Sequence, residues 1–94
     1  MPKRVDANQP EIVAALRAAG CSVCCIHTVG YGCPDLLVGR SGQNYLLEVK
    51  SARGVLSPYE VSWHASWRGQ VVIVRSVEEA FAACGIEFDK QGDV

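Results

Sequence analysis

Charged residues interrupt two apolar runs of this sequence, Gly32-Cys33-Pro34-Asp35-Leu36-Leu37-Val38 and Leu46-Leu47-Glu48-Val49-Lys50. Successive side chains of a β-strand point to opposite faces, so Glu48 and Lys50 are expected on one face and Val49 on the other. Two converging carboxylates suit a hard divalent cation such as Mg²⁺, which prefers oxygen ligands. A lysine beside that ion can orient or deprotonate a water molecule and stabilise charge on a phosphate. The pattern therefore favours the hydrolysis of a phosphodiester.

The same residues carry a resemblance to a known family. Twelve residues separate Asp35 from Glu48, and the pattern Pro34-Asp35 followed by Glu48-Val49-Lys50 resembles the PD-(D/E)XK nuclease signature. The flanking segments narrow the resemblance to the small VRR-NUC branch and extend it from about Glu11 to Ala80. These segments are Gly30-Tyr31-Gly32-Cys33-Pro34-Asp35-Leu36-Leu37, Gly54-Val55-Leu56-Ser57-Pro58 and Gly69-Gln70-Val71-Val72-Ile73-Val74-Arg75-Ser76.

The resemblance implies a restriction-endonuclease-like core in one domain over residues 1–94. This is an α/β fold in which helix, three strands, helix and strand follow one another and a mixed central sheet is flanked by helices. The resemblance also implies a metal-dependent endodeoxyribonuclease that leaves a 5′-phosphate and a 3′-hydroxyl. Asp35, Glu48 and the carbonyl of Val49 would then hold Mg²⁺ or Mn²⁺, and Lys50 would poise the attacking water.

Two further acids are candidate site residues. The first helix of the resembled family often supplies an acid to the metal shell, which would be Glu11 here, but Glu11 also fits the second half of a capping box with Asn8. At the position of Glu60 the family usually has glutamine. Glu60 is therefore expected either to belong to the site or to pair with His64 on the helix surface.

Partners follow from the same resemblance. Small free-standing members of this branch are associated with branched DNA, especially four-way junctions, and with phage or mobile-element genomes. We therefore expect DNA as the partner, a two-fold homodimer that presents one site to each of two strands, and the cytoplasm of a bacterium or of a phage-infected bacterial host. Two alternatives remain open: a catalytically silent nucleic-acid-binding module of the same fold, and a thiol-based zinc module.

Composition limits the other function classes. The 94 residues are 49% hydrophobic, which indicates one small globular domain and excludes a disordered chain. No apolar run approaches the roughly 20 residues of a membrane span, and the polar start is not a signal peptide. The net charge is −1, but up to Val77 there are eight Lys/Arg against five Asp/Glu. The basic residues expected to contact phosphates are Lys3, Arg4, Arg40, Arg53 and Arg68.

Five cysteines are many for this length. Cys21 and Cys24 have the spacing of zinc ligands, but strand alternation separates them and no second Cys-x-x-Cys follows. An odd count without a secretion signal argues against a disulfide framework. We therefore predict buried free thiols that pack as small apolar residues, and no structural zinc.

Capping, turn and periodicity signals predict the elements. In chain order they are a helix from Asn8 to before Gly20, strands over Cys21–Thr28, Asp35–Gly39 and Tyr45–Lys50, a helix from Ser57 to about Arg68, a strand over Val71–Val74 and a helix from Ser76 to Ala83. The hairpin turn is expected at 41–44, and the polar tail from Glu87 is expected to fray.

Aromatic residues and His27 complete the expectations. Trp63 and Trp67 share a helix face and are predicted to pack in the core. Tyr31 lies between two glycines just before Asp35, where it would either stack on an unpaired base or simply be part of a turn. His27 is predicted to be structural.

Overall fold

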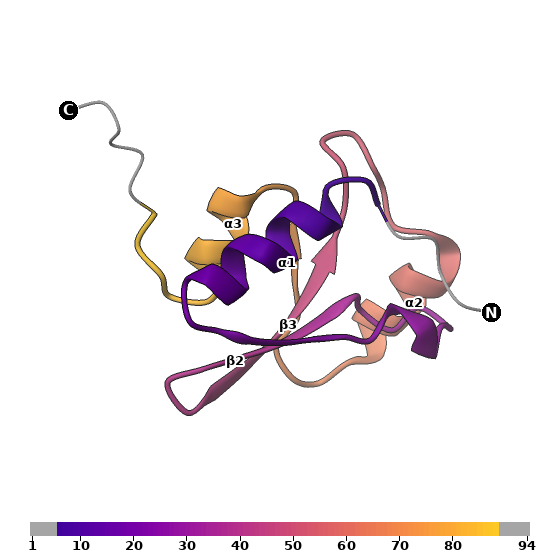
Figure 1. The fold of residues 1–94 in the computed structure, drawn as a ribbon. Helices are drawn as coiled ribbons and strands as arrows, with labels where there is room; N and C mark the ends of the chain where they lie inside the picture. Colours follow the sequence, from indigo (N-terminus) through magenta and orange to yellow (C-terminus); the bar gives the residue numbers. More distant parts are fainter. Residues whose placement is uncertain (1–5, 89–94) are drawn as a thin grey trace.

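The computed structural model describes residues 6–88, and the predicted α/β class is confirmed there. A four-stranded mixed sheet and three α-helices form the domain (Figure 1). The elements are α1 (Gln9–Ala18), β1 (Ser22–Cys25), a 3₁₀ turn η1 (His27–Val29), β2 (Leu36–Arg40), β3 (Gln43–Val49), α2 (Pro58–Ser66), β4 (Val72–Val74) and α3 (Val77–Ala83). No helix over this range is long and apolar enough to span a bilayer. Lys3, Arg4 and most of the polar tail predicted from Glu87 lie outside the described residues.

The sheet places the charged strand in its interior. Its order is β1-β2-β3-β4, with antiparallel pairing from β1 to β3 and parallel pairing between β3 and β4. Because β3 is paired on both sides, Glu48 and Lys50 are not the solvated pair of an edge strand. The hairpin turn is shorter than predicted, since Arg40 already pairs with Gln43.

The hairpin turn has a specific geometry. Ser41 and Gly42 have φ values of 51° and 77°. Positive φ at both central residues is the mark of a type I′ turn, whose twist matches that of the flanking strands. Strand β3 therefore begins at Gln43, two residues before the predicted start.

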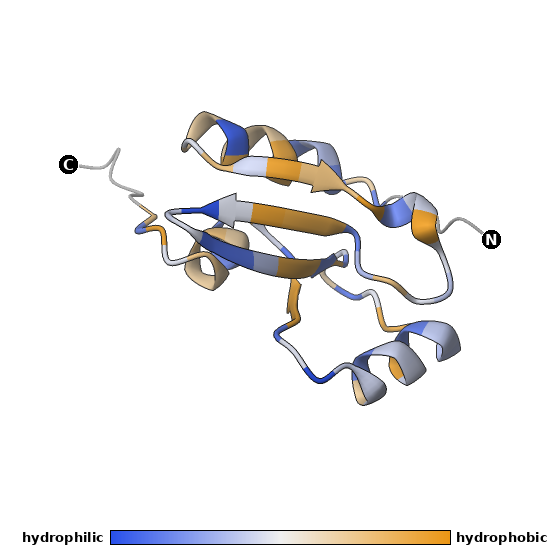
Figure 2. Cartoon of the chain, turned by 90° about the horizontal axis from the view of Figure 1, so that it is seen from below, coloured by the Kyte–Doolittle hydropathy of each residue, from blue (hydrophilic) through white to orange (hydrophobic). Residues whose placement is uncertain are grey.

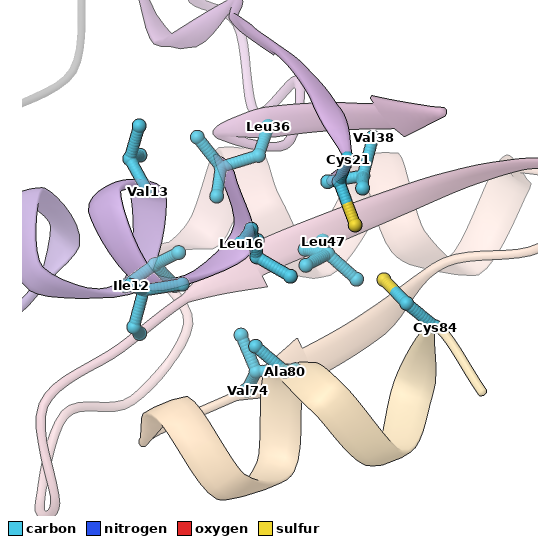
Figure 3. Close-up of a cluster of buried hydrophobic side chains, with 11 residues drawn as sticks. Ile12, Val13, Leu16, Cys21, Leu36, Val38, Leu47, Val74, Ala80 and Cys84 are labelled. Atoms are coloured by element: carbon cyan, nitrogen blue, oxygen red, sulfur yellow. The ribbon is translucent and has the colours of Figure 1, made fainter. Parts of the chain in front are cut away.

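The hydrophobic core lies between the sheet and the helices α1 and α3, which pack side by side (Figure 1). Val49 is buried in this core, so the strand alternation holds and Glu48 faces the other side of the sheet. Figure 3 shows the side chains from the two helices and the strands meeting in one cluster. Its members are Ile12, Val13, Leu16, Cys21, Leu36, Val38, Leu47, Val49, Val74, Ala80 and Cys84.

Two elements end earlier than predicted. Strand β1 stops at Cys25 and not at Thr28, because Ile26, with ψ of 15°, leaves the extended conformation and the chain enters the 3₁₀ turn. Helix α2 stops at Ser66 because Trp67, with ψ of 129°, has left the helical conformation. In both cases a local departure ends a pattern that the sequence would allow to continue.

The capping box with Asn8, one of the two alternatives for Glu11, does not form. Asn8 occupies the N-cap position of α1, but its side-chain amide donates to the carbonyls of Lys50 and Arg75, each at 3.2 Å. These long-range bonds fasten the start of α1 to the ends of β3 and β4. The predicted caps of the other helices are confirmed, since the hydroxyls of Ser57 and Ser76 each accept a backbone N–H three residues on.

Helix α2 contrasts with α1 and α3. Its only buried residue is Glu60, and Figure 2 shows it as mostly hydrophilic beside the apolar strands. Trp63 is half-buried and Trp67 is 43% exposed, and the two rings stack on each other with centroids 4.5 Å apart. The prediction that they belong to the core is wrong, because the core lies on the opposite face of the sheet. Polar contacts hold α2 at the sheet.

The five cysteines differ in burial, with Cys33 half-buried and the other four falling into two pairs. Cys21 and Cys84 are buried in the core, as predicted, and burial raises the pKa of the Cys84 thiol to about 11, with a further contribution from Cys21 that outweighs the lowering by Arg40. Cys24 and Cys25 are exposed, so the prediction of burial is wrong for these two. They lie on β1, which ends the sheet and is covered by α1 on one side alone.

Candidate functional site

The two apolar runs meet at a cavity of about 230 Å³ at the carboxyl end of β3. Its walls come from the turn before α1, the start of β2, the end of β3 and the start of α2. The lining residues are Asp6, Asp35, Glu48, Val49, Lys50, Ser57 and Glu60. Five of the six residues predicted for the site are thus brought together.

Asp35 is buried directly before β2. Its Oδ2 accepts a hydrogen bond from the Val49 N–H (2.7 Å), and its own N–H donates to the Leu47 carbonyl (3.1 Å). Regular pairing of the two strands ends with Leu36 opposite Leu47, so the carboxylate continues the ladder beyond the last paired residues. Asp35 therefore also holds the end of β3 in place.

Glu48 is fully buried on the face of β3 that looks toward α2. Its Oε1 lies 3.2 Å from Nε2 of His64, in the last turn of α2. A buried carboxylate is costly without a polar partner, and His64 supplies one. The surface pair expected between Glu60 and His64 is wrong, because His64 turns to the strand instead.

Lys50 makes an ion pair with Glu60, with 2.7 Å between Nζ and Oε1. The same Oε1 accepts the Ser57 N–H (2.8 Å), and the Glu60 N–H donates to the Ser57 hydroxyl (3.3 Å). Glu60 thus closes a capping box at the start of α2 and holds the ammonium of Lys50 in the cavity. The sequence had left this role undecided.

Hydrogen bonds from two side chains hold the backbone that begins at Lys50. Arg75 Nη1 donates to the carbonyls of Ser51 (2.6 Å) and Gly54 (2.8 Å), and Asn8 donates to the Lys50 carbonyl. These bonds order the loop that connects β3 to Ser57. The lysine therefore projects from a backbone that is fixed on both sides.

The turn before Asp35 packs closely against the first turn of α2. A Cβ on Gly32 would lie 2.3 Å from the carbonyl oxygen of Tyr59, which is too close for any side chain. Gly32 also has a φ of 85°, which residues other than glycine rarely adopt, so both the space and the backbone require glycine. Glu60 follows Tyr59 directly in the chain. The contact therefore sets the distance between the two walls of the cavity.

Asp6, and not Glu11, lines the cavity from the side of α1. Glu11 is exposed on the first turn of α1 and does not line the cavity. Asp6, just before α1, does line it, although the sequence analysis did not single it out. Ser57 is a second lining residue that was expected only as a helix cap. An acid just before a capped helix start is a weak signal, since many such acids only complement the helix dipole.

The charge of the cavity is strongly unbalanced. Among the described residues, the carboxylates of Asp6, Asp35, Glu48 and Glu60 line it together with the ammonium of Lys50. Buried acids of this kind are offset by protonation, by a paired basic side chain or by a bound cation. The donor set fits Mg²⁺ or Mn²⁺, which are held by one or two carboxylates and keep several waters. Asp35, Glu48 and the Val49 carbonyl would hold it.

Two observations argue against a metal ion at these residues. Within residues 6–88 no group of three or more His, Cys, Asp or Glu is arranged to hold a metal ion. The carboxylates of Glu48 and Glu60 contact His64 and Lys50. A cation at Glu48 would therefore compete with His64 for the same carboxylate.

The basic residues expected to contact phosphates are dispersed. Arg53 and Arg68 are exposed. Arg40 is half-buried and donates to the Cys84 carbonyl (3.3 Å), so part of its hydrogen-bonding capacity is used within the fold. Arg53 belongs to the loop after Lys50, close in the chain to the cavity.

None of the family models, curated proteins or solved structures with which the chain was compared matches it. The resemblance to VRR-NUC nucleases therefore rests on the residues quoted above and stays a prediction.

Proposed function

We propose that this chain is a Mg²⁺- or Mn²⁺-dependent endonuclease of the VRR-NUC type that hydrolyses phosphodiester bonds in DNA. The observation that carries the proposal is the cavity in which Asp35, Glu48 and Lys50 converge, with two buried carboxylates and one ammonium from adjacent strand ends. A structural role explains Asp35 in part, through its bond to Val49. It does not explain why a fully buried Glu48 and a lysine share the polar face of an interior strand.

When bound, the metal ion would lower the pKa of a water molecule and offset phosphate charge. The residues of the chain have separate tasks. Asp35 and Glu48 bind the cation, and Lys50 orients the attacking water or accepts its proton. Glu60 and His64 act as positioning residues, because each holds a charged group of β3 from the side of α2.

Branched DNA, especially a four-way junction, is the proposed substrate, and a homodimer in the bacterial cytoplasm is the proposed state. These finer statements follow from the family resemblance. Labelled single-strand, duplex, flap and four-way DNA, each incubated with Mg²⁺, Mn²⁺ or EDTA, test the activity and the substrate together. Cleavage of none of these forms with either metal would contradict the proposal.

A matched pair of variants tests the composition of the cavity. Asp6→Asn removes a lining carboxylate and is expected to slow cleavage, whereas Glu11→Gln changes an exposed acid outside the cavity and is expected to cut at the wild-type rate. The reverse result would restore Glu11 as the acid contributed by the first helix. Cleavage rates at saturating Mg²⁺ and at low Mg²⁺ distinguish a metal-binding defect from a loss of the fold.

A nucleic-acid-binding module that does not cut is the second candidate. The absence of a three-ligand group within the described residues and the contacts of Glu48 and Glu60 with His64 and Lys50 favour it. Such a module would bind DNA without metal and leave every DNA form intact.

A further inference from the structure

Tyr31 and Tyr59 form an exposed aromatic pair beside the acidic cavity. Their ring centroids lie 6.2 Å apart in an edge-to-face arrangement, and the residues are 69% and 67% exposed. Tyr31 belongs to the turn that leads to Asp35, and Tyr59 directly precedes Glu60 in α2. The pair therefore joins the two segments that supply Asp35 and Glu60 to the cavity.

The backbone of Tyr31 is strained, and burial of its side chain offsets little of that strain. Its φ is 55°, in the left-handed region that bulky side chains rarely adopt. Glycine would take this positive φ without strain, and Gly30 and Gly32 on either side have φ values of 76° and 85°. A ring that is 69% exposed gains little from burial. Strain of this kind at an exposed aromatic residue points to a ligand.

We propose that Tyr31 and Tyr59 stack on an unpaired nucleobase next to the phosphodiester in the cavity, so that the site selects single-stranded or unpaired DNA over intact duplex. This inference rests on the proposed function, and to the branched DNA proposed there it adds the requirement of an unpaired base beside the cut. Every base offers an apolar face to an aromatic ring, whereas in a duplex the bases are already stacked on one another.

Binding without metal separates stacking from cleavage. Fluorescence anisotropy in EDTA measures the affinity for a labelled dT oligonucleotide, for an oligonucleotide of the same length whose central nucleotides are abasic, and for a blunt duplex. The abasic strand keeps the phosphates and loses the bases. Wild-type protein is expected to bind the dT strand more tightly than the other two.

The variants are chosen so that none of them adds strain to the backbone at residue 31. Tyr31→Gly removes the ring and suits the positive φ, and Tyr59→Ala removes the second ring; each is expected to weaken dT binding by about tenfold and to leave abasic binding unchanged. Tyr31→Phe keeps the ring and the affinity. Val61→Ala is the control, since Val61 is 53% exposed on the same helix and, two residues on, points away from Tyr59. Circular dichroism verifies that each variant is folded.

The outcomes separate this inference from the nuclease proposal. Equal dT affinity of Tyr31→Gly, Tyr59→Ala and wild type overturns the stacking role, and so does an equal loss on the abasic strand. Cleavage with Mg²⁺ in the same preparations then leaves the nuclease intact. Conversely, dT binding that depends on the tyrosines, without cleavage of any DNA, supports stacking and identifies a module that does not cut.

Discussion

Removal of the Glu60 carboxylate is expected to destabilise the domain strongly, because one oxygen of this side chain serves two partners. Glu60→Ala deletes the acceptor of the Ser57 N–H, and loss of a helix cap costs about 1 kcal/mol. It also leaves the ammonium of Lys50, whose side chain is only 14% exposed, without its ion-pair partner. Breaking a buried pair costs about 3–5 kcal/mol. The lower end applies here, since Asp35 and Glu48 line the same cavity, so we expect about 4 kcal/mol in total.

Glu60→Gln is the matched variant. An amide oxygen still accepts the Ser57 N–H and can accept from Lys50, so the helix cap persists and the negative charge alone is lost. We expect a loss of about 1–2 kcal/mol, the difference between a charged and a neutral hydrogen bond partner. The ratio of the two losses distinguishes a charge effect from a capping effect.

Urea unfolding followed by far-ultraviolet circular dichroism measures these losses in the free energy of unfolding. Lys50→Ala and the double variant complete a thermodynamic cycle, for which we expect a coupling energy of at least about 1 kcal/mol. A cost of Glu60→Ala within about 1 kcal/mol of wild type, or no coupling with Lys50, would refute the reasoning, since the ion pair would then not exist in solution.

Further predictions concern activity and assembly. Cleavage is expected with Mg²⁺ or Mn²⁺ and none with EDTA, because in this mechanism the ion lowers the pKa of water and neutralises the phosphate; undiminished cutting in EDTA would exclude the metal mechanism. Cleavage is expected to slow at least about a hundredfold, with the fold intact, in each of Asp35→Ala, Glu48→Ala and Lys50→Ala. Glu60→Gln is expected to retain measurable activity. A wild-type rate for Lys50→Ala would remove Lys50 from the mechanism. No stoichiometric zinc and no disulfide are expected under reducing conditions, and plasma emission spectrometry that finds one zinc per chain would overturn this. Light scattering is expected to find a homodimer that places paired nicks on a four-way junction, with monomer alone favouring single nicks.

Patterns that depend on neighbours in the chain were predictable from the sequence. The alternation of Glu48, Val49 and Lys50 is confirmed because a period of two is a property of every β-strand, whatever its partners. Ser57 and Ser76 are confirmed as helix caps because a cap bonds a backbone N–H only three residues away. The α/β class follows from the same local signals taken in order.

The two possible capping boxes show why a local spacing is ambiguous by itself. Asn8 with Glu11 and Ser57 with Glu60 both fit the spacing of a capping box, yet only the second pair forms one. The amide of Asn8 bonds instead to the carbonyls of Lys50 and Arg75, more than forty residues away in the chain. A local spacing cannot indicate that such a competing partner is present.

Tertiary structure decided the partners within the cavity. Lys50 pairs with Glu60 and Glu48 with His64, while Glu11 points to solvent and Asp6 takes a place in the lining. Each of these contacts joins different elements, so it depends on how α2 and the turn before α1 dock on the sheet. Periodicity determines which face of an element a side chain occupies; only the packing of the elements determines what it meets there.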